Sequence, residues 1–171
     1  MTGDHDEFLE LTLPHLDVVW SIARRLARPP HEPEDLVQET YLKAFASFDR
    51  KRAGDTRAWL VAICLNTARS HARRVRRRPT EVPLTEGDVP SQENVSEQAL
   101  GAVEREALED ALAALPDPQR IAILLMDVAG MSARQTGEVV GAPRGTILAR
   151  VHRGRRKLVQ LLEEMDVIDG L

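Results

Sequence analysis

The apolar residues of this chain recur at spacings of three and four, which is the period of one face of an α-helix. A first helix is predicted from about residue 6 to residue 27. Its apolar stripe comprises Leu9, Leu13, Leu16, Trp20 and Ala23. Pro14 is expected to kink this helix or to begin a new helical segment, because proline cannot donate a backbone hydrogen bond.

Two more helices are predicted in the N-terminal half. One begins near Pro33 with acidic residues in its first turn, and both features suit a helix N-terminus. The apolar positions of this helix are Val37, Tyr41, Ala44 and Phe48. The next helix is capped by Asp55 or Thr56 and continues through an arginine run to Pro79. Its stripe comprises Trp59 or Leu60, with Ile63 and Thr67.

Residues 79–98 differ in composition from their surroundings. They contain three prolines, five acidic residues and no Lys or Arg. Such a segment is typical of a flexible linker, because it cannot bury enough apolar surface to fold. The chain is therefore predicted to hold two domains, residues 1–78 and residues 99–171.

Helical patterns resume after the linker. A helix over about 97–115 is followed by one that Asp117 caps and Gly130 ends. Ser132 and Gln135 form a capping box for a short helix that runs to Gly141, and a long final helix extends to about residue 164. No alternating strand pattern is present. We therefore expect an all-α protein of two small helical domains joined by a flexible, acidic linker.

Charge distribution changes the interpretation of the overall composition. The formal net charge of −4 argues against a nucleic-acid partner. However, residues 50–78 carry ten Lys or Arg and one acid, and residues 144–157 carry six Lys or Arg and no acid. Two basic patches on an acidic body indicate two contacts with polyanions, because local fields dominate at short range.

The segment from Ser132 to Lys157 has the pattern of a helix-turn-helix: a short helix, a turn with glycine, and a longer helix. Positions of the longer helix that lie off its apolar line can contact phosphates or base edges. They include Arg144, Thr146, Ala149, Arg150 and Arg153. The alternative is an ordinary helical hairpin whose arginines are only solvated.

Both halves also resemble a known family. DLVQETYLKAF (35–45) and TRAWLVAICLNTARSHARR (56–74) resemble region 2 of the extracytoplasmic-function (ECF, group 4) RNA polymerase sigma factors. LEDALAALPDPQRIAILLMDVAGMSARQTGEVVGAPRGTILARVHRGRRKL (108–158) resembles their region 4. The resemblance implies a factor that binds core RNA polymerase through its β′ and β subunits. It also implies recognition of the −10 and −35 elements of promoter DNA, and it leaves room for an anti-sigma protein as a partner.

The resemblance assigns roles to individual residues. Four residues are implied to bind a coiled coil of the β′ subunit, and they would lie on one side of their helix: Asp35, Gln38, Glu39 and Leu42. At the −10 element, the resemblance implies that the 49–56 connection forms a pocket for an extruded base and that the following helix adds further contacts. The residues implied at this element are Arg50, Lys51, Arg52, Asn66, Arg69, Arg73 and Arg74. The −35 contacts would come from Arg144, Thr146, Arg150 and Arg153. Trp59 is either a wedge between base pairs or, as its apolar position favours, a core residue.

Some positions depart from the family pattern. The first helix of the helix-turn-helix contains Thr136 and Gly137, which are poor helix formers. Ala149 stands where a serine is frequent. These changes bear on the −35 contacts more than on the fold.

Two other classes of protein fit the sequence less well. An operator-binding regulator would explain the C-terminal half but leaves the DLVQE helix without a role. An enzyme is not expected: Cys64 and His71 are about 10 Å apart along their helix, too far for a thiol–imidazole pair. No cofactor or metal site is predicted, and the single cysteine excludes an internal disulfide. With an acidic N-terminus and no membrane-length apolar run, the chain is expected in the cytoplasm without membrane insertion.

Overall fold

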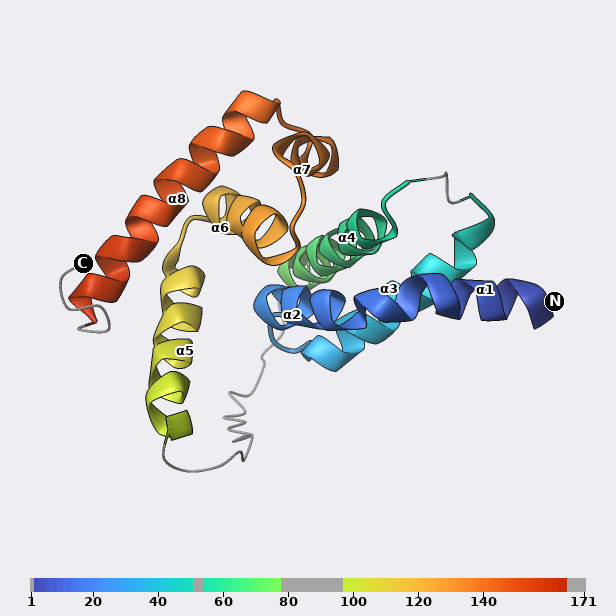
Figure 1. Cartoon of the computed structure of the whole chain (residues 1–171), viewed down its shortest axis with the longest axis horizontal. Helices are drawn as coiled ribbons and strands as arrows, with labels where there is room; N and C mark the ends of the chain where they lie inside the picture. Colours follow the sequence, from blue (N-terminus) through green and yellow to red (C-terminus); the bar gives the residue numbers. More distant parts are fainter. Residues whose placement is uncertain (1, 51–53, 78–96, 166–171) are drawn as a thin grey trace.

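The computed structural model describes residues 2–50, 54–77 and 97–165. Within these ranges every regular element is a helix (Figure 1). The N-terminal half comprises α1 (Thr2–Thr12), the 3₁₀ turn η1 (Leu13–His15), α2 (Leu16–Leu26), α3 (Pro33–Ala46), the 3₁₀ turn η2 (Phe48–Arg50) and α4 (Thr56–Arg77). The C-terminal half comprises α5 (Glu97–Ala114), α6 (Asp117–Ile123), the π-helix η3 (Leu124–Val128), α7 (Ala133–Val140) and α8 (Arg144–Glu164). The all-α prediction is confirmed, whereas most of the predicted linker lies outside the described residues.

The N-terminal half is a bundle in which α2, α3 and α4 pack pairwise. Ile22, Leu36 and Leu60, one from each helix, are fully buried at its centre. Phe8 of α1 closes one end, where it makes edge-to-face contacts with Tyr41, Phe45 and Phe48. Such aromatic contacts add to the stabilisation from burial.

The apolar stripe predicted for the first helix is wrong in its register. Pro14 divides the segment as expected, but it does so through the 3₁₀ turn η1, which rotates α2 relative to α1. As a result, Leu13, Leu16 and Trp20 are 51%, 39% and 37% exposed. The buried face of α2 instead comprises Val19, Ile22 and Leu26, together with Ala23, which was predicted.

In the C-terminal half, α8 packs against α5, α6 and α7. Ile147 and Val151 of α8 are buried. At Gly154 helices α6 and α8 approach so closely that an added Cβ would lie 2.6 Å from Cδ1 of Ile123. Helix α6 begins one residue earlier than predicted: Pro116 is the N-cap and Asp117 lies in the first turn.

The two halves share one hydrophobic cluster. Leu124 and Leu125 of η3 and the following Met131 are at most 3% exposed, and they belong to the same buried cluster as Leu60 and Leu65 of α4. Figure 1 shows α4 beside the α6–α7 side of the C-terminal half. The C-terminal half thus packs directly on α4, which the sequence did not indicate.

Candidate nucleic-acid and partner interfaces

The four residues expected to bind the polymerase lie on helix α3. Asp35, Gln38 and Leu42 are exposed, and Leu42 is 65% exposed. The side chain of Leu42 is thus accessible to a partner. Asp35 has a local role as well, because its Oδ2 accepts a hydrogen bond from the backbone N–H of Glu32 at 3.3 Å in a capping box.

Glu39 differs from its three neighbours because it is held by other side chains. Its Oε1 lies 2.6 Å from Nζ of Lys43, and its Oε2 lies 2.5 Å from Nε2 of His71 on α4. Burial opposes ionisation of this carboxyl, but hydrogen bonds and charges from Lys43 and His71 outweigh it and lower the pKa of Glu39 to about 2. Glu39 therefore ties α3 to α4 as well as lying on the exposed face.

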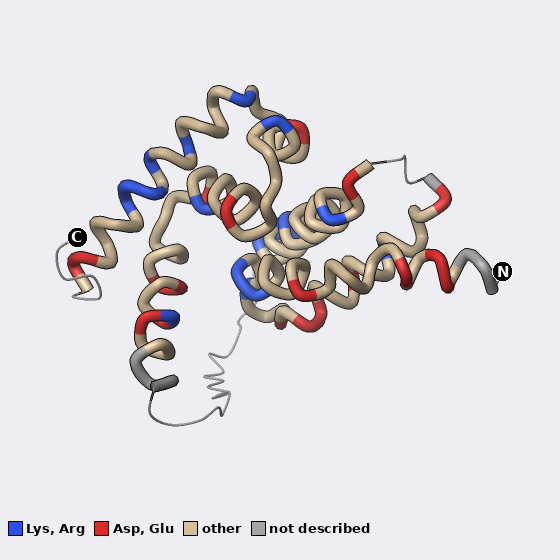
Figure 2. The backbone as a smooth tube through the Cα atoms, in the orientation of Figure 1, with Lys and Arg blue, Asp and Glu red and all other residues tan. Residues whose placement is uncertain are grey.

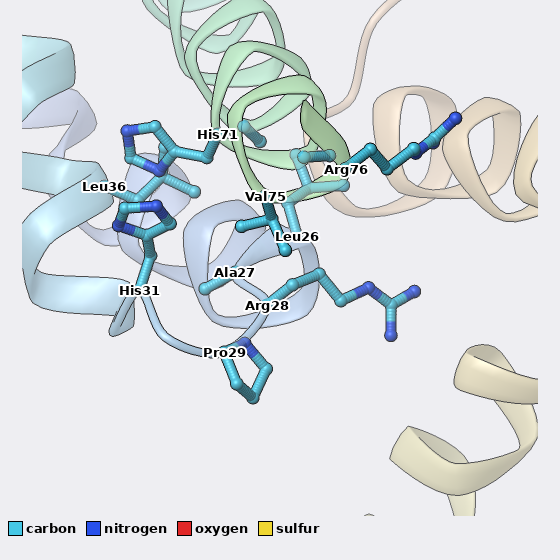
Figure 3. A pocket seen from close by; sticks show the side chains of 11 residues that line it. Leu26, Ala27, Arg28, Pro29, His31, Leu36, His71, Val75 and Arg76 are labelled. Atoms are coloured by element: carbon cyan, nitrogen blue, oxygen red, sulfur yellow. The ribbon is translucent and has the colours of Figure 1, made fainter. Parts of the chain in front are cut away.

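His71 also belongs to a small pocket at the end of the N-terminal bundle. Its ring stacks on His31 with the ring centroids 4.0 Å apart. Figure 3 shows the two histidines on one side of the pocket, with Arg28 and Arg76 extending toward the other side. In the described part of the chain no group of three or more His, Cys, Asp or Glu is arranged to hold a metal ion.

The residues expected at the −10 element lie on α4 where the structure describes them. Asn66, Arg73 and Arg74 are exposed and Arg69 is half-buried. Arg73 donates a hydrogen bond from Nη2 to Oγ of Ser70 at 3.0 Å. The backbone of Arg50 ends η2, and Lys51 and Arg52 lie outside the described residues. Trp59 is partly buried against the core, as its apolar position favours.

The helix-turn-helix forms as predicted. The Ser132 hydroxyl accepts a hydrogen bond from Gln135 N at 3.2 Å, and Gln135 Oε1 accepts one from Ser132 N at 2.8 Å. Gly141 has a φ of 72°, the left-handed conformation that favours glycine at the end of a helix. The short turn places Arg144 in the first turn of α8.

The structure explains why glycine stands at position 137, which the sequence did not reveal. A Cβ at this position would lie 2.4 Å from the carbonyl oxygen of Ala142. The same turn brings the Ala142 N–H within 2.9 Å of the Gly137 carbonyl. The departure from the family pattern at Gly137 thus permits a close approach of the turn to α7.

The −35 candidates lie along α8. Arg144 and Arg153 are exposed, whereas Thr146 and Arg150 are half-buried. Figure 2 shows Lys and Arg recurring along α8. One of the six cations in this segment is used within the fold, because Arg155 binds both carboxylate oxygens of Asp127, at 3.0 and 2.6 Å.

Polar contacts between the two halves accompany their shared cluster. Gln135 Nε2 donates to Oδ2 of Asp55 at 3.1 Å, and Arg57 donates to the carbonyl of Gly130 at 3.3 Å. Elsewhere, Arg24 and Arg25 of α2 both bind Oε1 of Glu109 on α5, at 3.0 and 2.7 Å. These contacts connect residues more than 70 positions apart, so no local sequence pattern could have indicated them.

The same packing brings two sets of candidate DNA contacts together. Arg69 of α4 and Arg150 of α8 line one cavity of about 230 Å³, together with Asp117 and Ile121 of α6. Arg69 is a candidate for the −10 element and Arg150 for the −35 element. In this arrangement candidates for the two promoter elements thus line the same cavity.

The thiol of Cys64 is shielded from solvent. Cys64 is fully buried in α4, and burial raises the pKa of its thiol to about 11 although a hydrogen bond with Thr40 lowers it. A thiol with such a pKa is protonated at neutral pH and unreactive. Among the described helices, none is long and apolar enough to span a membrane.

Both halves match models of a single protein family. Residues 11–78 match Sigma-70 region 2 and residues 105–158 match Sigma-70, region 4. The chain is 36% identical over 155 residues to the ECF RNA polymerase sigma factor SigE of Mycolicibacterium smegmatis, covering 87% of this chain and 59% of SigE. It is 37% identical over 130 residues to the ECF sigma factor EcfG of Rhodopseudomonas palustris, covering 75% of this chain and 70% of EcfG.

A solved structure agrees with these relatives. The sigma factor RpoE of Bartonella quintana, in complex with the anti-sigma factor NepR, superposes with a TM-score of 0.72 and 28% identity, covering 92% of this chain and 97% of RpoE. An operator-binding regulator does not explain a match that includes region 2 as well as region 4. The chain therefore belongs to the sigma-70 family and, within it, to the ECF sigma factors, which are non-enzymatic initiation factors that bind RNA polymerase and direct it to specific promoters.

Proposed function

We propose that the exposed face of α3 binds core RNA polymerase while α4 and α8 contact the −10 and −35 elements of the same promoter. The domains that carry these roles are residues 1–78 and 99–171, with 79–98 as the linker. The observation that carries the proposal is the accessibility of Leu42 within the acidic DLVQE helix. Binding of core polymerase and promoter DNA takes place in the cytoplasm, where both are found.

On α3, Gln38 and Leu42 provide the direct contacts with the β′ coiled coil. Leu42 supplies apolar surface and Gln38 a hydrogen-bonding amide, and both side chains are free of the bundle. Asp35 and Glu39 add negative charge, which orients a basic partner and speeds association. Replacing Glu39 would affect the fold as well as polymerase binding, because Glu39 also binds Lys43 and His71.

On α4, Asn66 and Arg69 contact the −10 element, and Arg73 and Arg74 follow the phosphates of the separated strand. Arg50, Lys51 and Arg52 precede this helix and complete the base pocket. Arginine forms bidentate, charge-assisted hydrogen bonds with phosphate, which suits it to this position.

On α8, Arg144, Thr146, Arg150 and Arg153 contact the −35 element. Arg144 lies at the helix N-terminus, where positive charge and free backbone N–H groups favour a phosphate. Arg150 and Arg153 follow about one and a half and two and a half turns later and can reach the bases or the second strand.

Promoter binding requires the two halves to separate. Sites one to two turns of duplex apart are roughly 35 to 70 Å from each other. Arg69 and Arg150, however, line the same cavity of about 230 Å³. The closed arrangement, in which the C-terminal half packs on α4, is therefore the state before promoter binding. An anti-sigma protein, of the kind seen with the B. quintana relative, would act by preventing this opening.

Initiation with purified core polymerase and a library of genomic promoters tests the proposal. We expect transcripts that start at a defined set of promoters only when the chain is present. A Gln38→Ala, Leu42→Ala double variant should abolish them, whereas Glu34→Gln, on the same helix outside the four residues, should not. Transcripts that are independent of the chain, or unaffected by the double variant, would contradict the proposal.

A further inference from the structure

A cleft between the two halves gathers arginines from both of them. It has a volume of about 290 Å³, and its apolar lining includes Leu26, Leu65 and Ile121. Its charged lining comprises Arg28, Arg69, Arg73, Arg76 and Arg120, with Asp117 as the only acid. Four of these arginines belong to the N-terminal half, and Arg120 belongs to α6.

Arg120 is the most constrained member of this set. It is 6% exposed, and its Nη2 donates to Oδ1 of Asp117 at 2.6 Å. Its Nε is buried and has no hydrogen-bond partner in the structure. Burial, and then the nearby positive charge of Arg28, lower the pKa of Arg120, although Asp117 opposes this. A buried donor without a partner is unfavourable, which makes Arg120 the least satisfied of these arginines.

The other arginines of the cleft are also available to a ligand. Within the described ranges, Arg28, Arg69 and Arg76 form no ion pair, and Arg73 binds only the hydroxyl of Ser70. Five guanidinium groups against one carboxylate concentrate positive potential in a recess with apolar walls. The closed arrangement holds these like charges together across the boundary between the halves.

We infer that the cleft binds an oligophosphate group, either free or as part of a nucleotide, which bridges Arg28 of the N-terminal half and Arg120 of the C-terminal half. Guanidinium groups match phosphate oxygens in bidentate geometry, and several phosphates in one chain can contact arginines from both sides. The volume lies near the lower limit for small-molecule sites and is too small for duplex DNA. Arg120, being buried, cannot reach a DNA backbone in solvent.

The site has a regulatory consequence that rests on the proposed function. Arg69 and Arg73 are also proposed contacts for the −10 element. A ligand that binds only the closed arrangement stabilises it in proportion to its concentration, and it competes with promoter phosphates for these two arginines. The oligophosphate therefore disfavours the open, promoter-binding state.

Calorimetric titration of the full chain with sodium tripolyphosphate at constant ionic strength tests the site. We expect saturable binding of one anion per chain. Arg28→Gln and Arg120→Gln should each weaken it at least about tenfold, since each removes a charge-assisted contact. Arg134→Gln is the matched control, because Arg134 lies on α7 outside the cleft with its side chain 82% exposed.

Absence of saturable binding would overturn the inference, as would equal weakening in all three variants, which indicates non-specific attraction. If Arg120→Gln fails to fold, Arg28→Gln alone decides, because Arg28 is exposed. Hydrogen exchange gives a second readout: tripolyphosphate should protect amides of both α4 and α6. Protection of α4 alone would overturn the bridging of the two halves.

Titrations with ATP and GTP distinguish the two sources of the ligand. Tighter binding than tripolyphosphate supports a nucleotide, and equal binding supports free polyphosphate; binding of an acidic peptide in place of any phosphate overturns the inference.

Initiation assays without added phosphate separate this site from the proposed function. A chain that binds tripolyphosphate but supports no initiation contradicts the function alone, whereas the reverse result contradicts the site alone.

Discussion

Gln135 donates a hydrogen bond to Asp55 at 3.1 Å, and each residue also caps its own helix. Asp55 Oδ1 accepts from the N–H of Ala58 in α4, and Gln135 completes the capping box of α7. The start of the proposed −10 helix is thereby joined to the start of the helix-turn-helix. The side chains of Asp55 and Gln135 thus both cap their helices and hold the two halves together.

The ion pairs of Glu109 allow the closed arrangement to be weakened without disturbing a helix cap. Unlike Asp55 and Gln135, Glu109 caps no helix. Glu109→Gln removes the charge that binds Arg24 and Arg25. Partly exposed pairs of this kind contribute about 1 kcal/mol, so the ratio of closed to open chains should fall roughly fivefold. Small-angle scattering should then show a larger radius of gyration. Glu106→Gln, on the same helix and in no ion pair among the described residues, should leave the radius unchanged, and equal effects of both would contradict this role of Glu109.

Gly137 should be the least replaceable glycine of the helix-turn-helix. Gly137→Ala places a Cβ against the Ala142 carbonyl and should destabilise the fold by about 1–3 kcal/mol, as overpacking does. Gly145→Ala is the matched control, because nothing lies within 4 Å of its added Cβ. Since alanine favours helix, this control should keep or slightly raise stability. Urea unfolding followed by circular dichroism measures both, and a stable Gly137→Ala protein would show that the turn can move.

Glu39 should make stability depend on acid pH. Its pKa falls from an ordinary value of 4.5 to about 2 in the folded chain, so its ionised form stabilises the fold. That stabilisation is fully present above about pH 4.5 and is lost as the pH falls toward 2. The difference in free energy of unfolding between the native chain and Glu39→Gln should therefore shrink over this window. A constant difference would mean that the contacts with Lys43 and His71 do not lower this pKa.

The Cys64 thiol should resist modification in the folded chain. With a pKa of about 11, roughly one thiol in a thousand is ionised at pH 8, and the side chain is fully buried. A disulfide reagent should therefore react with native protein at the rate of its unfolding, and at once in guanidinium chloride. Rapid reaction of the native chain would contradict the buried position of Cys64 in α4.

Helix boundaries could be predicted where local chemistry determines them. Ser132 and Gln135 form the expected capping box, Asp55 caps α4, and Gly141 ends α7 in the left-handed conformation. Each of these features depends on residues within four positions of one another. The positions of the candidate site residues on α3, α4 and α8 followed from the same local patterns, although their roles remain predictions.

Features that depend on distant residues could not be predicted. The 3₁₀ turn at Pro14 changed which residues of α2 are buried, so Leu16 and Trp20 lie outside the core. The side of η3 that carries Leu124 and Leu125 packs on the N-terminal half, and a periodic pattern cannot say which partner covers a face. Likewise, Glu39 and His71 are 32 positions apart, and only packing of α3 on α4 brings them together.

The division of labour between α3 and α8 is tested most directly by measuring affinity for core polymerase, with initiation assayed on the same samples. We predict that the Gln38→Ala, Leu42→Ala variant loses polymerase affinity by at least about tenfold. The Arg144→Ala, Arg150→Ala variant should keep that affinity and lose initiation at promoters with a −35 element, while Arg105→Ala on α5 changes neither. Unchanged polymerase affinity in the first variant, or lost affinity in the second, would contradict the account.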